Sequence, residues 1–335
     1  MLLNEPLFLG VEIGGTKLQL GLGDRDGSLV ALERGEVRVD RGAPGILERI
    51  GELADDLFDK HQISSLNLSA IGVGFGGPVD VSAGRVIGSH QIDGWTNFPL
   101  ASWFRDRFGV DSIAIQNDAD AAALAESVCG GGIGRSPVVY VTIGSGIGGG
   151  LVVDGSIYRG NGLWALEIGH LLIDDPDRPG VKLELEQIAS GWSIGRSARG
   201  LVRSRTDEHA DISVLYQLSN HHIDAIDARL VGRAAALGDS MSLAVLDRAR
   251  RAFAAALAHV VMLTAPERII LGGGVSLIGE ELWLEPIRNE LDRLVPASFR
   301  GRFDVVPASL GENVVVVGAL VLARRMIVHS RERLE

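Results

Sequence analysis

The chain has 335 residues, of which 46% are hydrophobic and 22% are charged, a balance typical of a globular protein that excludes a disordered one. Its 44 glycines are roughly twice the usual frequency of ~7%, but no Gly-x-y period exists, so collagen is excluded. The net charge of −11 gives no general attraction for nucleic acid or an anionic membrane, and the single cysteine excludes an internal disulfide and a cysteine-rich zinc site.

The first third of the chain alternates short apolar strands with helices. Strands are predicted at 7–13, 17–23 and 28–33, with an Asp-Gly hairpin turn at 24–27. Apolar residues at helical spacing then predict a helix at 44–60, with Pro44 near its start. The elements predicted next are a strand at 68–73, a helix at 100–108, a strand at 112–116 and a helix at 118–128.

The order of elements then begins again. A strand at 137–143 ends in Gly144, and a strand at 147–153, an Asp-Gly turn and a strand at 156–158 follow. The segments IGGTKLQLGLGDRDGSLV, from Ile13, and IGSGIGGGLVVDGSIY, from Ile143, therefore share the order strand, glycine turn, strand, Asp-Gly turn, strand. We predict an internal duplication on this basis.

The remainder of the chain is predicted to be mostly helical. Helices are expected at 187–203, 225–237, 241–264 and 280–294, with one strand at 268–271 and a final helix that begins at 314. No linker rich in Ser and Gly separates the two halves, so we expect two lobes that pack closely around a cleft.

Four glycine clusters follow apolar strands, at 14–15, 72–77, 144–150 and 272–274. Backbone N–H groups in such turns can point into a concavity that holds an anion, so a phosphate-bearing ligand is predicted. The segment GVEIGGTK is not a P-loop, because Thr-Lys stands where Gly-Lys-Ser/Thr is required. The two G-x-G-x-x-G matches do not open a helix, so a dinucleotide-binding fold is rejected.

Together these motifs resemble the ROK family of bacterial sugar kinases and sugar-responsive repressors, within the sugar kinase/hexokinase/actin superfamily. The resemblance implies an α/β, two-lobed actin-like ATPase fold in which each lobe has a ribonuclease-H-like mixed sheet flanked by helices. Residues 1–118 would form the smaller lobe, which the helix at 314–335 is a candidate to complete, and residues 119–313 the larger lobe. Family repressors carry an N-terminal helix-turn-helix, which is not expected here because the first phosphate loop begins at residue 10.

The resemblance also implies ATP and Mg²⁺ as cofactors. The residues that match the family's phosphate loops are Gly14, Gly15, Thr16, Lys17, Gly144, Ser145, Gly146 and Gly148. Gly272, Gly273 and Gly274 match the loop beside adenosine. Glu12 stands where the family usually has Asp, and would assist Mg²⁺ indirectly, through water.

Phosphorylation of a sugar hydroxyl needs a base that accepts the hydroxyl proton. Asp118 follows a strand and opens a helix, so the residues alone allow either a helix cap or a base. The segment QNDADAAALAE resembles the family's Asn-Asp-x-x-x-Ala, which implies that Asp118 is the base and that Asn117 binds the sugar. Asp120 is the less suitable base because it lies further into the helix.

Glu167 and His170 are three residues apart, so on a helix they would share a face and could hold a metal. The resemblance implies instead that these two residues and Glu186 bind sugar hydroxyls, with Gly77 beneath the sugar. Glu184 is interpreted as a solvated helix charge. Many family members also bind zinc through this His and a Cys-rich loop. The corresponding loop here, LLIDDPDRPGVKLELE, has no cysteine, so no zinc is expected.

The sequence therefore predicts an ATP-dependent hexose kinase acting on the primary hydroxyl, with glucose converted to glucose 6-phosphate. The alternatives are a kinase for fructose, mannose, N-acetylmannosamine or N-acetylglucosamine, or a non-catalytic sugar-binding regulator of the same family. A small-molecule sugar and a second copy of the chain are the expected partners, without nucleic acid or membrane. A cytoplasmic location is expected, because no secretion signal is found and the longest apolar runs are shorter than the ~20 residues of a membrane span.

Overall fold

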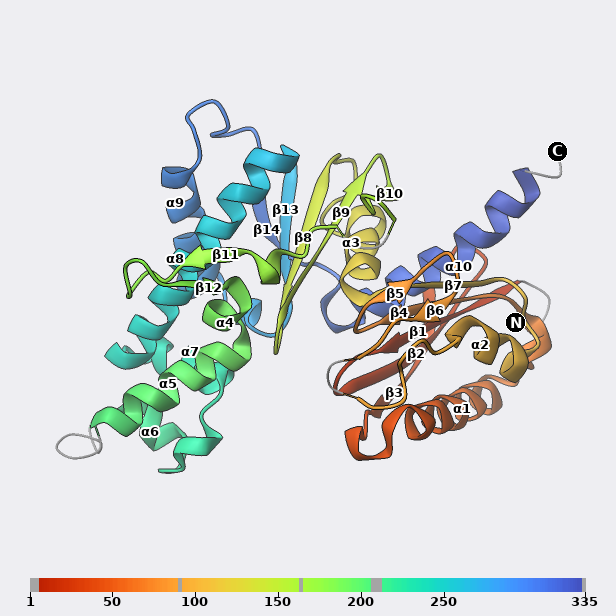
Figure 1. Cartoon of the computed structure of the whole chain (residues 1–335). Helices are drawn as coiled ribbons and strands as arrows, with labels where there is room; N and C mark the ends of the chain where they lie inside the picture. Colours follow the sequence, from red (N-terminus) through yellow and green to blue (C-terminus); the bar gives the residue numbers. More distant parts are fainter. Residues whose placement is uncertain (1–5, 90–91, 163–164, 206–212, 333–335) are drawn as a thin grey trace. The chain divides into compact units, whose positions relative to one another are not determined.

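The computed structural model describes residues 6–89, 92–162, 165–205 and 213–332, and the chain divides into two compact units (Figure 1). Unit 1 comprises residues 1–133, 155–165 and 312–335, and unit 2 comprises residues 134–154 and 166–311. The expected boundary after residue 118 is therefore wrong. Helix α3 (Asp118–Cys129) belongs to unit 1 because it packs against α10 (Val314–Glu332), the last helix of the chain.

Unit 1 is built on a mixed five-stranded sheet with the order β3-β2-β1-β4-β7. Its strands are β1 (Leu7–Ile13), β2 (Lys17–Gly23), β3 (Leu29–Glu36), β4 (Leu68–Phe75) and β7 (Ile113–Asn117). The first three strands pair antiparallel, whereas β4 pairs parallel with both β1 and β7. A short hairpin, β5 (Val79–Asp80) and β6 (Arg85–Val86), and helix α2 (Leu100–Phe108) complete the elements between β4 and β7.

The two faces of this sheet are covered by different helices. Leu9 and Val11 share a buried cluster with the apolar side of α1 (Gly42–His61), whereas Phe8 packs in a second cluster with Leu320 of α10. Because successive strand residues point to opposite faces, α1 and α10 lie on opposite sides of the sheet (Figure 1).

Part of the glycine excess serves this packing. A side chain at Gly72 of β4 would lie 1.8 Å from the backbone oxygen of Ala319, and one at Gly318 of α10 would lie 1.9 Å from that of Ala121 in α3. The backbones can approach this closely only because both positions lack a Cβ atom.

Gly318→Ala is therefore expected to lower the free energy of unfolding by about 2 kcal/mol or more, because the methyl group must push α10 away from α3. Gly200 is the matched control, since it is exposed in helix α5 (Gly191–Arg205) and has open space around it. Gly200→Ala should instead stabilise the protein by about 0.5–1 kcal/mol. Urea unfolding measures both effects, and equal effects of the two substitutions would contradict this packing.

Unit 2 contains most of a second sheet with the order β10-β9-β8-β13-β14. Its strands are β8 (Val138–Ile143), β9 (Ile147–Val153), β10 (Ser156–Ile157), β13 (Arg268–Gly272) and β14 (Asp304–Pro307). In each sheet the first strand, β1 or β8, pairs antiparallel with the strand that follows it. On its other side it pairs parallel with β4 or β13, which in turn pairs parallel with β7 or β14. The predicted duplication is therefore confirmed at the level of topology.

Helices make up most of the rest of unit 2. They are α4 (Leu185–Ala189), α5 (Gly191–Arg205), α6 (Val214–Leu218), α7 (Ala228–Ala236), α8 (Ser240–Thr264) and α9 (Glu285–Leu294). The prediction of one strand in this region is wrong, because β14 pairs with β13 and a hairpin forms from β11 (Leu172–Asp174) and β12 (Lys182–Glu184). Within the described ranges, no helix is long and apolar enough to cross a membrane.

Candidate active site

The first glycine turn connects β1 to β2 in unit 1. The N–H of Gly14 donates to the oxygen of Lys17 at 2.9 Å, which closes the turn, and the N–H of Gly76 donates to the oxygen of Ile13 at 2.8 Å. The turn therefore lies directly beside the glycine cluster that follows β4. These contacts bring together the predicted phosphate-loop residues and the predicted floor of the sugar site.

Glu12, at the end of β1, is an unusual carboxyl group because only 7% of the residue is exposed. Its Oε2 lies 3.3 Å from Nζ of Lys17, and Lys17 also donates a hydrogen bond to the backbone oxygen of Glu312. Burial raises the pKa of Glu12 to about 7, with further contributions from the negative charges of Asp118 and Glu312, although Lys17 opposes the shift. Glu12 is thus a carboxyl group that takes up or releases a proton near neutral pH.

Asp118 is the first residue of α3, but it is not the cap of that helix. Asn117 is the N-cap, and its Oδ1 accepts hydrogen bonds from the N–H groups of Ala119 and Asp120. The interpretation of Asp118 as a cap is therefore wrong, although its Oδ1 accepts a bond from Ala119 N–H at 2.8 Å. Asp118 is partly exposed, and a side chain at Gly76 would lie 3.3 Å from its Oδ2.

Asp120, the competing candidate base, has a structural role. Its Oδ2 accepts a hydrogen bond from the Gln116 side-chain amide at 2.6 Å, and Gln116 in turn accepts one from Arg159 at 3.1 Å. Asp120 is 9% exposed, compared with the partly exposed Asp118. Of the two carboxyl groups, Asp118 is therefore the more accessible candidate base.

A small cavity of about 90 Å³ lies next to these residues in unit 1. Its lining comes from the first glycine turn, the end of β4 and the segment after it, and consists of Ile13, Gly14, Gly15, Phe75, Gly76, Gly77, Pro78, Ser89 and Ile92. This volume corresponds to about three liquid water molecules, so it suits one end of a small polar molecule. Gly77, the residue expected beneath the sugar, is among these lining residues, and its backbone oxygen accepts a hydrogen bond from the Asn117 amide at 3.2 Å.

The second glycine turn connects β8 to β9 in unit 2 and repeats the closure of the first. The N–H of Gly144 donates to the oxygen of Gly146 at 2.9 Å, and the oxygen of Gly144 accepts from Gly191 N–H at the start of α5 at 2.8 Å. Ser145 is exposed at the tip of the turn. A side chain at Gly146 would lie 3.1 Å from Oε2 of Glu186, so this turn and one predicted sugar ligand are neighbours.

Glu167 precedes a short 3-10 helix (Ile168–His170), not an α-helix, and His170 is its last residue. This helix lies directly on β9, since a side chain at Gly169 would lie 2.2 Å from the oxygen of Ile147. Loss of surrounding water and the negative charge of Glu186 raise the pKa of Glu167, while His170 opposes this effect. Unit 2 therefore brings together all three side chains that the resemblance assigns to the sugar.

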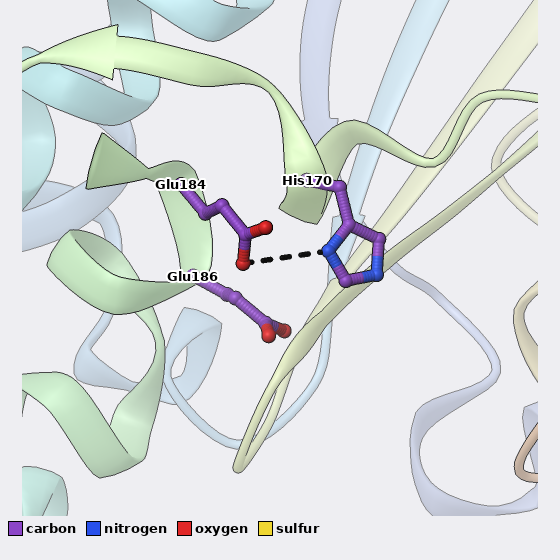
Figure 2. A group of neighbouring side chains, drawn as sticks. All are labelled: His170, Glu184 and Glu186. Carbon is purple, nitrogen blue, oxygen red and sulfur yellow. Dashed lines mark ion pairs between the residues drawn. The ribbon is translucent and has the colours of Figure 1, made fainter. Parts of the chain in front are cut away.

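A fourth side chain, Glu184, joins this group. Its Oε2 lies 3.5 Å from Nδ1 of His170, and Figure 2 shows the carboxylates of Glu184 and Glu186 directed toward the imidazole. One ligand atom each of His170, Glu184 and Glu186 falls within 4.8 Å of the others. Glu184 is half-buried, so its interpretation as a solvated helix charge is wrong. Zinc accepts imidazole and carboxylate ligands, so the absence of cysteine alone does not exclude a cation here.

The third glycine-rich loop, Gly272–Gly274, follows β13 in unit 2 and packs against the end of β8. Gly273 has a φ of +84°, and a Cβ atom there would lie 2.5 Å from the backbone of Ile143. Only glycine satisfies both conditions at this position. Gly274 has open space around it, so the loop presents accessible backbone beyond the packed position.

Sequence reasoning missed two contributors, Glu184 and Glu312. Glu184 reaches His170 through the β11–β12 hairpin, where Leu172 lies opposite Glu184. Glu312 reaches Lys17 only because α10 returns to the first sheet. A predicted hairpin in the 171–186 loop could have indicated the first contact, whereas no local signal indicates the second.

The chain is similar to known proteins over nearly its whole length. The model of the ROK family matches residues 8–326 of this chain. A glucokinase of Thermotoga maritima is 31% identical over 96% of this chain and 98% of its own length, and one of Streptomyces coelicolor is 33% identical over 95% and 98%. The crystal structure of a ROK family glucokinase from Streptomyces griseus, in complex with glucose and AMPPNP, has a TM-score of 0.80 at 32% identity and covers 95% of this chain and 99% of that chain.

Proposed function

Because the chain belongs to the ROK family, we propose that it is an ATP-dependent hexose kinase that phosphorylates a primary hydroxyl, with glucose as the first candidate substrate. Two glucokinases align with it over nearly the whole length of both chains. The similar structure from Streptomyces griseus holds glucose together with an ATP analogue, which supports both the acceptor and the donor.

The observation that carries this proposal is the environment of Asp118. Its carboxyl lies beside Gly76, next to a small cavity and close to the first glycine turn, while its neighbour Asn117 caps the helix. A carboxylate in such a position can accept the proton of a hydroxyl as that hydroxyl attacks phosphorus. Asp120 is held by Gln116 and is not available for this role.

Both units contain candidate binding residues. In unit 1, the backbone of Gly14–Thr16 and the Lys17 ammonium would bind phosphate oxygens, and Gly77 would contact the sugar. In unit 2, the turn at Gly144–Gly148 would bind phosphate, and Gly272–Gly274 would lie beside adenosine. Glu167, His170 and Glu186 would bind sugar hydroxyls and so select which hydroxyl reacts.

Glu12 fits the requirement for a group that assists Mg²⁺. Its Oε2 is buried, with Lys17 Nζ as its ion-pair partner, and within the described residues it has no hydrogen bond. Carboxylate oxygen is a ligand that Mg²⁺ prefers, either directly or through water. When bound, the cation would neutralise charge on the phosphates. Glu12 itself would have to release its proton, which a pKa of about 7 permits at neutral pH.

A panel of hexoses tests the proposal. Purified protein with ATP and Mg²⁺ should release ADP with glucose, fructose, mannose, N-acetylmannosamine or N-acetylglucosamine, and we expect the highest kcat/KM with glucose. ADP release that does not depend on any sugar would contradict the proposal. A higher kcat/KM with another hexose would leave the kinase assignment intact but replace the substrate.

The second candidate is a non-catalytic sugar-binding regulator. The observation that favours it is Glu12, because its ionised carboxylate, 3.3 Å from Lys17 Nζ, can hold that lysine away from phosphate. Isothermal titration separates the two functions. Glucose binding without turnover of any sugar would favour the regulator.

A further inference from the structure

The side chain of His170 needs a partner to hold it in one orientation. It lies at the end of a 3-10 helix and is 61% exposed. Glu184 is the one ion-pair partner that His170 has within the described residues. An exposed imidazole without a partner would sample several rotamers, and ordering it on sugar binding would reduce affinity.

Glu184 can serve as this partner because secondary structure on both sides of it fixes its backbone. It ends strand β12, opposite Leu172 of β11, and it is the N-cap residue of α4. Its N–H donates to the Gln187 side chain at 3.3 Å, and the N–H of the next residue, Leu185, donates to the oxygen of Leu171 at 2.9 Å. The residue after His170 is thus bonded directly to the residue after Glu184.

We propose that Glu184 is a positioning residue whose carboxylate orients the His170 imidazole and holds its proton on Nδ1, so that Nε2 accepts a hydrogen bond from a sugar hydroxyl. This inference rests on the proposed sugar contact of His170. A neutral imidazole has one donor and one acceptor nitrogen, and the partner of one nitrogen decides the role of the other. The negative oxygen 3.5 Å from Nδ1 favours the proton there.

The proton position proposed for His170 determines which sugar groups can form hydrogen bonds here. His170 Nε2 and the Glu186 carboxylate, which lies in the same cluster, would both act as acceptors. Two acceptors side by side bind hydroxyl groups that donate, so neighbouring sugar hydroxyls would be required at this position. A deoxy sugar that lacks one of these hydroxyls would leave one of the two acceptors without its hydrogen bond and should bind more weakly.

A double-mutant cycle in sugar binding tests the role. Glu184→Gln keeps the size of the side chain but removes its charge, and should weaken glucose binding about tenfold, raising KM more than it lowers kcat. In a His170→Ala background, the same substitution should have no further effect, because the group it orients is gone. Asp174→Asn, on the same hairpin, is the control and should change neither quantity. Equal effects of Glu184→Gln in both backgrounds would overturn the proposal, since that is the result of a role in capping α4 alone.

A second measurement does not depend on sugar turnover or binding. The ¹⁵N shifts of the His170 ring in the free protein, recorded where the imidazole is neutral, should report protonated Nδ1 in the wild type and a shift toward protonated Nε2 in Glu184→Gln. Unchanged shifts would overturn the proposal even in an active kinase, and the expected shifts would uphold the pair even if no sugar is phosphorylated. Stoichiometric zinc in the purified protein, whose removal reproduces the Glu184→Gln effect, would also overturn it.

Discussion

Replacing Asp118 by Asn is expected to lower kcat about 10³-fold while the affinity for glucose changes by no more than a few-fold. The size is that of a lost general base, for which about 10²–10⁴ is typical. Asn keeps an oxygen that can accept the hydrogen bond from Ala119 N–H, so the start of α3 should be preserved. The loss should therefore fall on the chemical step, and steady-state kinetics together with glucose titration will measure it.

Asp111→Asn provides the matched control for this experiment. Asp111 precedes β7 in the same unit, 96% of its side chain is exposed, and its Oδ1 lies 3.5 Å from Nε of Arg105. Its substitution should leave kcat and affinity unchanged. Turnover of Asp118→Asn close to that of the control would show that another group, or bulk water, accepts the proton.

Glu12 should make the stability of the ligand-free protein depend on pH. Between pH 4.5, the ordinary pKa, and about 7, the pKa in the folded state, the folded protein holds a proton on Glu12 that the unfolded chain has lost. The folded state binds more protons than the unfolded state in this window. The contribution of Glu12 to the free energy of unfolding therefore falls as pH rises and is constant above about pH 7. Removing the carboxyl should abolish this contribution.

The expected result is a difference between two pH dependences. From pH 5 to pH 8, wild-type protein should lose about 2–3 kcal/mol more unfolding free energy than Glu12→Gln, as measured by urea unfolding without nucleotide, sugar or Mg²⁺. Glu48→Gln, a change at an exposed carboxyl of α1, should follow the wild-type curve. Parallel curves for the wild type and Glu12→Gln would show that Glu12 remains ionised in the folded protein.

Several elements could be read from local sequence because turn residues mark their ends. Strands β1, β2 and β9 and helix α2 have the predicted bounds. The turn residues Gly14–Thr16, Asp24–Gly27 and Gly109 directly follow the ends of β1, β2 and α2. Strand β14 was missed, since it has only four residues, ends in Pro307 and gains its pairing from β13. Such an edge strand is defined by its neighbour rather than by its own pattern.

The candidate site likewise combines features that local sequence indicates with features that depend on distant segments. The glycine turns and the Asn117-Asp118 pair carry local signals, so the sequence could indicate them and their surroundings. The unit boundary and the contact of Lys17 with Glu312 depend on α10, which returns from the far end of the chain to the first sheet. The role of Glu184 depends on a hairpin in a polar loop with no strong strand pattern. Packing between distant segments decides these features, and local spacing does not reveal them.

The identity of the product decides whether this protein phosphorylates the primary hydroxyl of glucose. Purified protein is incubated with ATP, Mg²⁺ and ¹³C-labelled glucose, and the products are examined by ³¹P and ¹³C NMR. We expect one phosphomonoester per ADP released, with phosphorus coupled to carbon 6 of the sugar, and no such product with Asp118→Asn on the same time scale. Release of inorganic phosphate without a sugar phosphate, or a phosphate on a carbon other than the primary one, would contradict it.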